Sequence, residues 1–151
     1  MKKKRPTHQT KHIVNRRARH DYELDDSLVV GIALTGAETK NLRLGHGQLR
    51  GAYVNTKDNE LWLVNAAING TNSIPISEND QTRNRRLLAK RREIDALIDA
   101  KQQGRTIVPL EMLTSGRYIK LRIAIGRGKK LYDKRETLKR RDAERKIQQH
   151  L

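Results

Sequence analysis

The side chains that could do chemistry in this sequence are cationic and aromatic, and a dense group of them lies near the start of the chain. Residues 15–22 read Asn-Arg-Arg-Ala-Arg-His-Asp-Tyr. Arginine neutralises phosphates, whereas tyrosine, histidine and the guanidinium plane stack on unpaired bases. A single His20 or Tyr22 is more often structural, but here both adjoin a basic segment. This combination favours a nucleic acid as the partner, although composition does not choose which one.

Residues for catalysis are not grouped in this way. A nuclease would need clustered carboxylates or a histidine pair, and the sequence offers neither. The stretch Gly126-Arg127-Gly128-Lys129 resembles part of a phosphate-binding loop, but it lacks the leading glycine and the following Ser or Thr. The chain has no cysteine, and its five histidines are scattered: His8, His12, His20, His46 and His150. We expect no catalytic residue, no metal site and no cofactor.

The charge of the chain is unevenly distributed. The 151 residues contain 33 Lys and Arg against 17 Asp and Glu, for a formal charge of +16. Residues 1–19 contribute +8, residues 20–126 only +2, and residues 127–151 +6. The two basic ends lack the apolar surface needed to offset an ordering entropy of roughly 1–2 kcal/mol per residue. We therefore expect a disordered arm at 1–12, a folded domain at 13–126 and a basic tail at 127–151, with a polyanion as partner.

A third basic cluster falls inside the folded part. Ten residues that contain no acid carry six cations: Arg83, Arg85, Arg86, Lys90, Arg91 and Arg92. Six cations without a neutralising acid would repel one another in a purely structural role, so this run predicts a phosphate-facing patch. The alternative is a solvated surface.

Alternating apolar and polar residues predict a mainly β protein with short helices. Pro109 requires an edge or bulge position, and Trp62 is expected to pack in the core rather than stack on a base. Residues 69–82 form a long polar loop, which suggests mobility or binding. The expected strands are Leu24–Thr35 (bent near 25–27), Tyr53–Lys57, Glu60–Ile68, Thr106–Thr114 and Arg117–Ile125, and the expected helices are Ala37–Leu44 and Arg91–Gln103. At this size, an antiparallel barrel of the oligonucleotide-binding fold is the natural candidate.

The sequence predicts a cytosolic location. Its longest apolar run, Leu28–Leu34, is far shorter than the roughly 20 residues that cross a bilayer. The basic start is followed by polar residues 6–11 rather than by the apolar stretch of a signal peptide. We therefore expect no membrane association.

Four stretches together resemble a known family. Residues 128–139 read Gly-Lys-Lys-Leu-Tyr-Asp-Lys-Arg-Glu-Thr-Leu-Lys and are similar to the G-K-K-x-x-D-K-R signature of the SsrA-binding protein (small protein B) family. The other matching stretches are Asn15–Tyr22, Gly36–Arg43, and Asp80–Leu88 followed by Arg92-Glu93. The chain departs from the family pattern at Thr39, Asn41 and Gln81, the last of which replaces a proline.

The resemblance implies a bacterial, non-enzymatic partner of tmRNA in trans-translation. In such a protein, an oligonucleotide-binding barrel grips the tRNA-like domain of tmRNA. A basic tail, helical when ribosome-bound, enters the empty decoding site and mRNA channel of a stalled ribosome, on its small subunit. We expect the chain to be monomeric and to act in this ribosome rescue.

The resemblance and the basic segments together nominate the contact residues. Glu38 is included because a carboxylate can accept hydrogen bonds from a guanine edge, with a surface salt bridge to Lys40 or Arg43 as the alternative. In the tail, Tyr132 is expected to stack on a decoding-centre base and Asp133 to cap the helix. The tmRNA-binding set is Asn15, Arg17, Arg19, His20, Tyr22, Glu38, Lys40, Arg43, Arg83, Arg85 and Arg86; the decoding-site set is Lys129, Lys130, Tyr132, Asp133, Lys134 and Arg135.

Two other functions remain open from sequence. A ribosomal or general structured-RNA-binding protein would share the charge and the fold, and only the tail signature separates it from the family. An RNA-processing enzyme is disfavoured because the sequence lacks a metal or nucleophile set.

Overall fold

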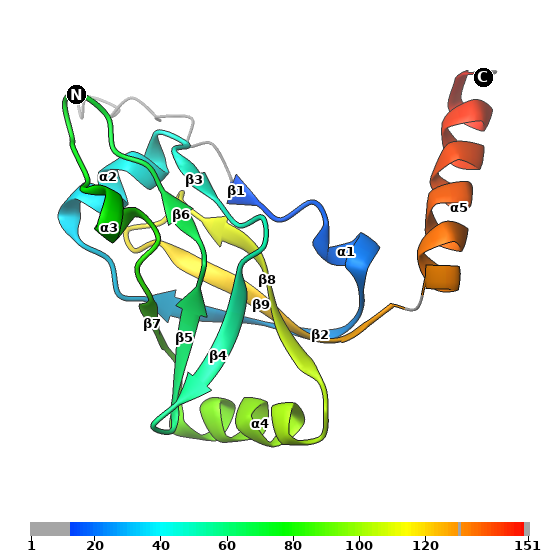
Figure 1. The fold of residues 1–151 in the computed structure, drawn as a ribbon, viewed down its shortest axis with the longest axis horizontal. Coiled ribbons are helices and arrows are strands. Elements are labelled where there is room, and N and C mark those ends of the chain that lie inside the picture. The colour runs from blue at the N-terminus through cyan, green and yellow to red at the C-terminus, as the bar shows by residue number, and fades with distance from the viewer. Residues whose placement is uncertain (1–12, 130, 150–151) are drawn as a thin grey trace, which may run out of the picture.

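Seven antiparallel strands form one curved sheet in the order β1-β8-β9-β2-β7-β5-β4 (Figure 1). This computed structural model describes residues 13–129 and 131–149. The strands of the large sheet are β1 (Ile13–Val14), β2 (Tyr22–Ile32), β4 (Tyr53–Lys57), β5 (Glu60–Val64), β7 (Arg85–Leu88), β8 (Thr106–Leu113) and β9 (Lys120–Gly128). The strands β3 (Gly47–Gln48) and β6 (Ala67–Ile68) pair separately.

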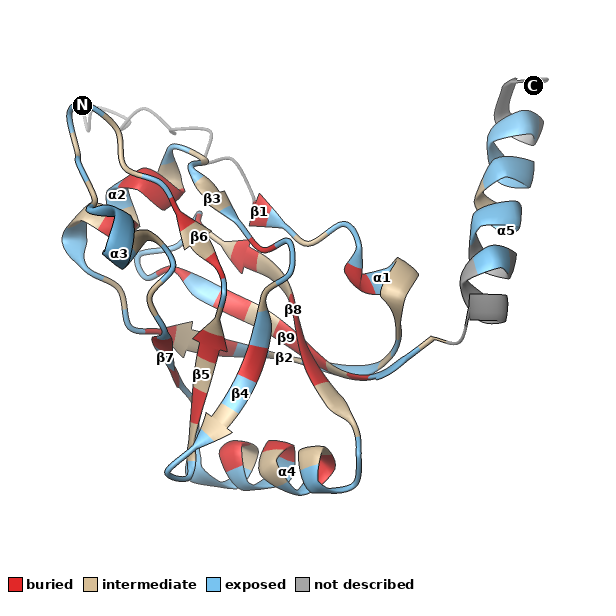
Figure 2. Cartoon of the chain, in the orientation of Figure 1, coloured by how far each residue is buried: buried red, intermediate tan, exposed pale blue. Residues whose placement is uncertain are grey.

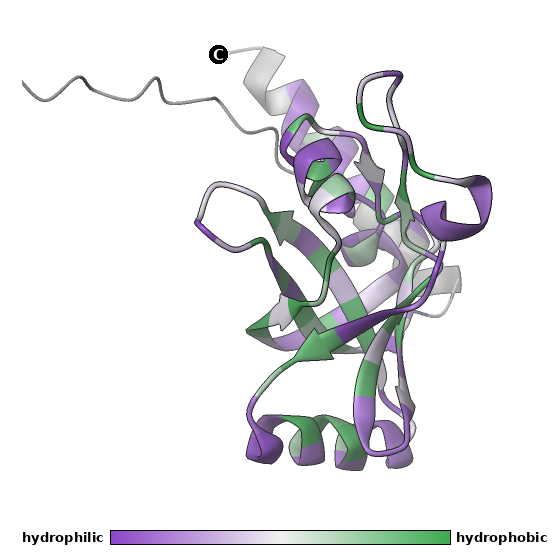
Figure 3. Cartoon of the chain, turned by 90° about the vertical axis from the view of Figure 1, so that its left-hand side faces the viewer, coloured by the Kyte–Doolittle hydropathy of each residue, from purple (hydrophilic) through white to green (hydrophobic). Residues whose placement is uncertain are grey.

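The described residues also form five helices: α1 (Ala18–Asp21), α2 (Gly36–Arg43), α3 (Glu78–Gln81), α4 (Arg91–Gln102) and α5 (Leu131–Gln149), the last of which projects away from the sheet in Figure 1. The expected helices correspond to α2 and α4, whereas the one-turn helices α1 and α3 were not predicted because four residues carry no helical periodicity. Helix α4, at the bottom of Figures 1 and 3, alternates hydrophobic and hydrophilic segments, and it buries Ile94 and Leu97. Almost all residues of α5 whose burial is described are exposed, as the colours of Figure 2 show.

The core lies on the concave side of the sheet. Leu61, Leu63, Leu87, Leu121 and Ile123 are each 0% exposed and come from three different strands, β5, β7 and β9. The curvature brings β4 close to β8. Over the part of the chain that the structure describes, no backbone pairing joins β4 to β1 or β8, so the barrel stays open at this seam. The prediction of a mainly β, antiparallel fold with short helices is confirmed.

Local turn chemistry explains several strand boundaries. Asp58 and Asn59 both have positive φ (53° and 59°), as a tight hairpin between β4 and β5 requires. The register shifts between Leu24 and Ser27 and between Pro109 and Glu111 confirm the predicted bend and bulge. The expected strand Glu60–Ile68 is instead two strands. Asn65 at φ 63° ends β5, and β6 then pairs with β3.

Trp62 does not pack in the core, so that prediction is wrong. Strand pleating sends Leu61 and Leu63 inward, and Trp62 between them therefore lies on the outward face. Its side chain is partly exposed. The apolar composition of β5 does not reveal which of its residues face outward.

No helix among residues 13–129 and 131–149 is both long and apolar enough to cross a membrane. The predicted arm at 1–12 lies outside the described residues. Strand β9 runs to Gly128, so backbone pairing with β2 continues beyond residue 126.

Segment 69–82, between β6 and β7, depends on a close backbone approach at Gly70. A Cβ there would overlap the backbone nitrogen of Ile76 and lie 3.1 Å from the carbonyl carbon of Pro75. The neighbouring turn is closed by the Thr71 amide, which donates to the Ile74 carbonyl at 2.9 Å. Only glycine fits at position 70 without moving this turn.

We predict that Gly70→Ala destabilises the fold by about 1–3 kcal/mol, because backbone atoms must shift to admit the methyl group. Urea unfolding monitored by circular dichroism measures the loss. Gly36→Ala is the matched control, because a Cβ at that position meets nothing within 4 Å. It should be neutral or stabilising by up to about 1 kcal/mol. Equal stabilities for the two variants would contradict the prediction.

Candidate nucleic-acid interface

A buried ion centre forms where α2 meets β7. Thr35 caps α2: its hydroxyl accepts from the Glu38 amide at 3.2 Å, and the Glu38 carboxylate accepts from the Thr35 amide at 2.9 Å. The same carboxylate accepts from Nε of Arg85 at 2.6 Å and from a guanidinium nitrogen of Arg83. Glu38 is 2% exposed and Arg85 0%. One carboxylate thus joins the helix cap to the strand.

Arg85 uses all its guanidinium donors inside the protein. Besides the bond to Glu38, it donates to the carbonyl oxygens of Ala66 at 2.9 Å and Arg83 at 3.1 Å. It also donates to those of Asp80 at 3.2 Å and Gln81 at 3.0 Å. Arg85 therefore connects α2, the start of β6 and the end of segment 69–82.

Hydrogen bonding decides the charge state of this centre. Burial by itself raises the pKa of Glu38, but hydrogen bonds from Arg83, the Thr35 amide and Arg85 outweigh it, so the pKa lies below its ordinary value of 4.5. Burial lowers the pKa of Arg85 from its ordinary value, although the Glu38 carboxylate opposes the shift. We conclude that the centre is an ion pair at neutral pH.

Two sequence predictions are corrected here. The prediction that Glu38 meets a guanine edge is wrong, because both of its carboxylate oxygens bond to groups inside the protein. Its salt bridge is also not with Lys40 or Arg43. Arg85, likewise predicted to contact RNA, is buried. These two residues can act on a ligand only by holding other elements in place.

The six cations at 83–92 do not share one exposed surface, because alternate residues of β7 face opposite sides of the sheet. Arg85 points inward and Arg83 is half-buried beside Glu38, while Arg86, Lys90, Arg91 and Arg92 are exposed. Although this run contains no acidic residue in the sequence, acidic side chains from other positions lie close to it in the structure. Arg86 lies 3.7 Å from Glu60, and Arg91 pairs with Asp95 at 2.9 Å. The outward members alone remain candidates for phosphate contact.

Two of the three positions where the chain departs from the family pattern make hydrogen bonds to segment 69–82. Asn41 is buried, and its side-chain amide donates to the Ile74 carbonyl at 3.0 Å. Gln81 donates to the Ile76 carbonyl at 3.3 Å, and Thr39 donates to the Thr35 carbonyl at 3.0 Å. Two of the three departures therefore tie this segment down.

Arg43 bridges α2 and the β8–β9 turn, because its guanidinium donates to the Thr114 and Arg117 carbonyls at 3.0 and 2.9 Å. These bonds give it a structural role, whereas Lys40 on the same helix is exposed. Contact of either residue with RNA remains a prediction.

The segment 15–22 presents cations from a fixed backbone. Asn15 is held by β8: its amide nitrogen donates to the Leu110 carbonyl at 2.7 Å and its side chain to the Pro109 carbonyl at 2.9 Å. Arg17 and Arg19 are exposed. His20 is 2.9 Å from a carboxylate oxygen of Asp21, so its ring is oriented by an acid. The segment thus presents three exposed arginines, Arg16 included, near Tyr22.

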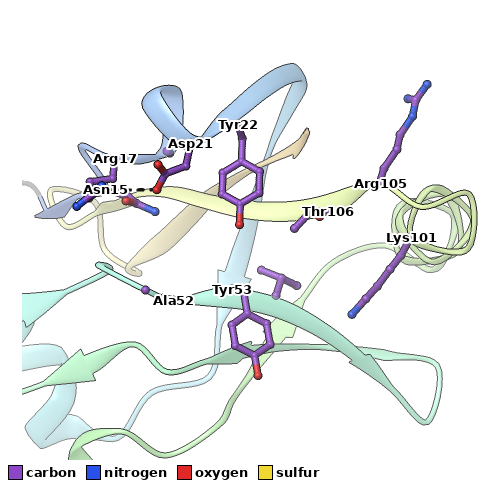
Figure 4. Close-up of a pocket in the computed structure, with 12 residues that line it drawn as sticks. Asn15, Arg17, Asp21, Tyr22, Ala52, Tyr53, Lys101, Arg105 and Thr106 are labelled. Atoms are coloured by element: carbon purple, nitrogen blue, oxygen red, sulfur yellow. Dashed lines mark ion pairs between the residues drawn. The ribbon is translucent and has the colours of Figure 1, made fainter. Parts of the chain in front are cut away.

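A groove of about 310 Å³ opens beside this segment, at the seam between β4 and β8 (Figure 4). In Figure 4 the ring of Tyr22, from β2, points toward β4, and the ring of Tyr53 extends from β4 in the same direction. The amine of Lys101, from α4, reaches β4, where it donates to the Asn55 side-chain oxygen at 2.7 Å. The predicted residues that line the groove are Asn15, Arg17 and Tyr22, and those that the sequence reasoning missed are Tyr53, Lys101 and Arg105. Curvature of the sheet brings them together, and no local sequence signal marks them.

This groove has the composition of a site for single-stranded nucleic acid. It combines two tyrosine rings with three cationic side chains. Tyr53 is 45% exposed, so its ring is accessible to a base. Among the residues that the structure describes, no three His, Cys, Asp or Glu side chains are placed to hold a metal ion.

The predicted decoding-site residues lie at the junction of β9 and α5. Lys129 is anchored to α1, because its amide nitrogen donates to the Asp21 carbonyl at 2.9 Å and its amine to the Arg19 carbonyl at 2.8 Å. Lys130 lies outside the described residues. Tyr132, Asp133 and Lys134 are in α5, but their side chains are outside the description, and Arg135 is exposed.

Comparison with known proteins gives a consistent result. A family model described as "SmpB protein" matches residues 12–151. The SsrA-binding protein of Roseiflexus sp. (strain RS-1) is 45% identical over 139 residues, which cover 91% of this chain and 88% of that protein. The SsrA-binding protein of Trichormus variabilis (strain ATCC 29413 / PCC 7937) is 46% identical over 136 residues, covering 89% and 88%.

A solved structure is also similar. A chain from work described as "tmRNA-SmpB: a journey to the center of the bacterial ribosome" superposes with a TM-score of 0.65 at 38% sequence identity. The match covers 80% of this chain and 85% of that chain.

We predict that Glu38→Gln destabilises the protein by about 3–5 kcal/mol at neutral pH, because it leaves a buried guanidinium without its counter-ion. Since the folded pKa of Glu38 is below 4.5, its ionised form stabilises the protein above about pH 4.5. This stabilisation is lost as pH falls through the folded pKa. The stability gap between wild type and Glu38→Gln should therefore narrow in acid.

Chemical denaturation at several pH values measures this gap. Glu144→Gln, at an exposed position in α5, is the matched control and should change stability by less than about 0.5 kcal/mol. A gap that stays constant from pH 7 to pH 3 would contradict the assignment of an ionised Glu38.

Proposed function

Because the chain belongs to the SmpB family of SsrA-binding proteins, we propose that it binds the tRNA-like domain of tmRNA and delivers it to stalled ribosomes. The observation that supports this most is the match of the family model to residues 12–151, which include both the groove segment and the tail. The protein then acts by binding rather than by catalysis, in the cytoplasm, where stalled ribosomes occur.

The groove supplies the chemistry for the RNA contact. Arg17, Lys101 and Arg105 neutralise phosphates, and the rings of Tyr22 and Tyr53 stack on bases that the folded RNA leaves unpaired. A tRNA-like fold offers such bases in its loops, whereas a regular duplex does not. Asn15, anchored to β8, keeps the basic segment at the groove.

The tail completes the proposal. Helix α5 carries many exposed cations and few apolar side chains, so it cannot bury a core of its own, and rRNA would supply the binding energy. Lys129, just before this helix, is bonded to α1, which adjoins the proposed tmRNA contact. The tmRNA contact of segment 15–22 and the ribosome contact of α5 would then lie next to each other, joined by the bonds of Lys129 to α1.

We predict that Tyr53→Leu weakens binding of the tRNA-like domain by about 5- to 150-fold, the loss of one stacked base at about 1–3 kcal/mol. Fluorescence anisotropy with a labelled tRNA-like domain at physiological salt measures it. Tyr118→Leu removes an aromatic ring that is 69% exposed and does not line the groove, and it should bind as wild type does. If the two variants bind equally, the groove is not the contact.

We predict that a chain ending at Lys129 binds the tRNA-like domain within about twofold of wild type but does not support tagging of stalled chains. This cut keeps the β2–β9 pairing and the bonds of Lys129 to α1, so the groove stays intact. A reconstituted translation system with a truncated mRNA measures tagging. Normal tagging by the shortened chain would refute the role of the tail.

A further inference from the structure

Trp62, the single tryptophan of the chain, lies on the outward face of β5 and does not line the groove. Its indole N–H donates to the Lys57 carbonyl at 3.4 Å, which holds the ring over the β4–β5 hairpin. In Figure 1, β4 and β5 lie in front of the other strands and no helix crosses them. A large, partly exposed aromatic ring is therefore fixed on an uncovered sheet face.

Cationic side chains adjoin this ring. Arg86 of β7 is directly opposite Trp62 in the strand register, and opposite side chains on one face of a sheet have Cβ atoms about 4.5–5.5 Å apart. Its side chain is 52% exposed. Arg91, at the start of α4, is equally exposed and approaches the same carboxylate, that of Glu60.

The contacts of Arg86 and Arg91 with Glu60 are loose. The nearest nitrogen–oxygen distances from Arg86 and Arg91 to Glu60 are 3.7 and 3.9 Å, longer than a hydrogen bond, and the two guanidiniums share one carboxylate. Arg91 also donates to Asp95 at 2.9 Å and to the Asn59 carbonyl at 2.6 Å, and Lys57 adds another exposed cation. The Arg86 guanidinium, whose nearest acidic partner is 3.7 Å away, therefore keeps donors that a phosphate can engage.

We propose that Lys57, Trp62, Arg86 and Arg91, the Trp62 platform, form a second RNA-binding surface that takes an unpaired segment. A base stacks on the indole of Trp62, and the flanking phosphates bind Arg86 and Arg91. A duplex does not fit, because its bases are stacked on one another and present no free face. An acidic peptide would satisfy the cations but not the ring.

The single tryptophan makes the test specific, because its fluorescence reports on this position alone. Titration of the full chain with a 12-residue oligouridylate at physiological salt should quench the emission, and a 12-base-pair RNA duplex or polyglutamate should not. Arg86→Gln should raise the quenching midpoint and lower the slope of log affinity against log salt by about 0.7, one phosphate contact. Lys120→Gln, at an exposed cation on β9, is the matched control and should leave both unchanged.

A second measurement separates this surface from the groove. With a labelled oligouridylate, Trp62→Leu should weaken binding by at least about fivefold and Trp62→Phe by less, because phenylalanine keeps a stacking ring. Both variants should bind the tRNA-like domain within about twofold of wild type. If the oligouridylate result contradicts the Trp62 platform, the proposed function therefore still stands. Unchanged oligouridylate binding by Trp62→Leu, or equal quenching by the duplex or polyglutamate, would overturn the proposal.

Discussion

The pairing of two charges that have both left solvent, Glu38 and Arg85, is the interaction on which the rest of this structure depends. Removing two ions from water costs several kcal/mol each, and the cost is recovered only where every donor and acceptor is satisfied. Here the carboxylate accepts from Thr35, Arg83 and Arg85, and the remaining donors of Arg85 reach backbone carbonyls. The centre therefore tolerates little displacement of α2, β6 or β7.

Strand β7 connects this ion centre to the proposed RNA-binding groove. In the strand order it joins β2, with β9, β8 and β1 beyond it, to β5 and β4. The groove lies where these two parts of the sheet approach each other again, between β8 and β4. The placement of β7 thus sets how far Tyr22 and Tyr53 stand apart. Under the proposed function, Glu38 and Arg85 would support RNA binding without contacting RNA themselves.

The sequence allowed β2, β4, β5, β8 and β9, the bend near residue 25 and the bulge at Pro109 to be predicted, because alternation and proline geometry act locally. The short strands β1, β3 and β7 were missed, because two to four residues show too little alternation. It could not reveal the ion centre. Glu38 has Lys40 and Arg43 nearby in sequence, whereas its actual partners, Arg83 and Arg85, are 45 and 47 residues away. The same limit hid Tyr53 and Lys101, which only the curvature of the sheet brings to Tyr22, and the outward orientation of Trp62. The family, by contrast, was accessible from sequence, because its tail signature is contiguous.

A double-mutant cycle on the ion centre tests this account most directly. The free energies of unfolding of Glu38→Met, Arg85→Met and the double variant are compared with that of wild type. Each single variant leaves one buried charge unpaired, so the account predicts that the double variant is destabilised by less than the sum, with a coupling energy on the order of 3 kcal/mol. Effects that add to within about 0.5 kcal/mol would show that the two residues act independently and would contradict the account.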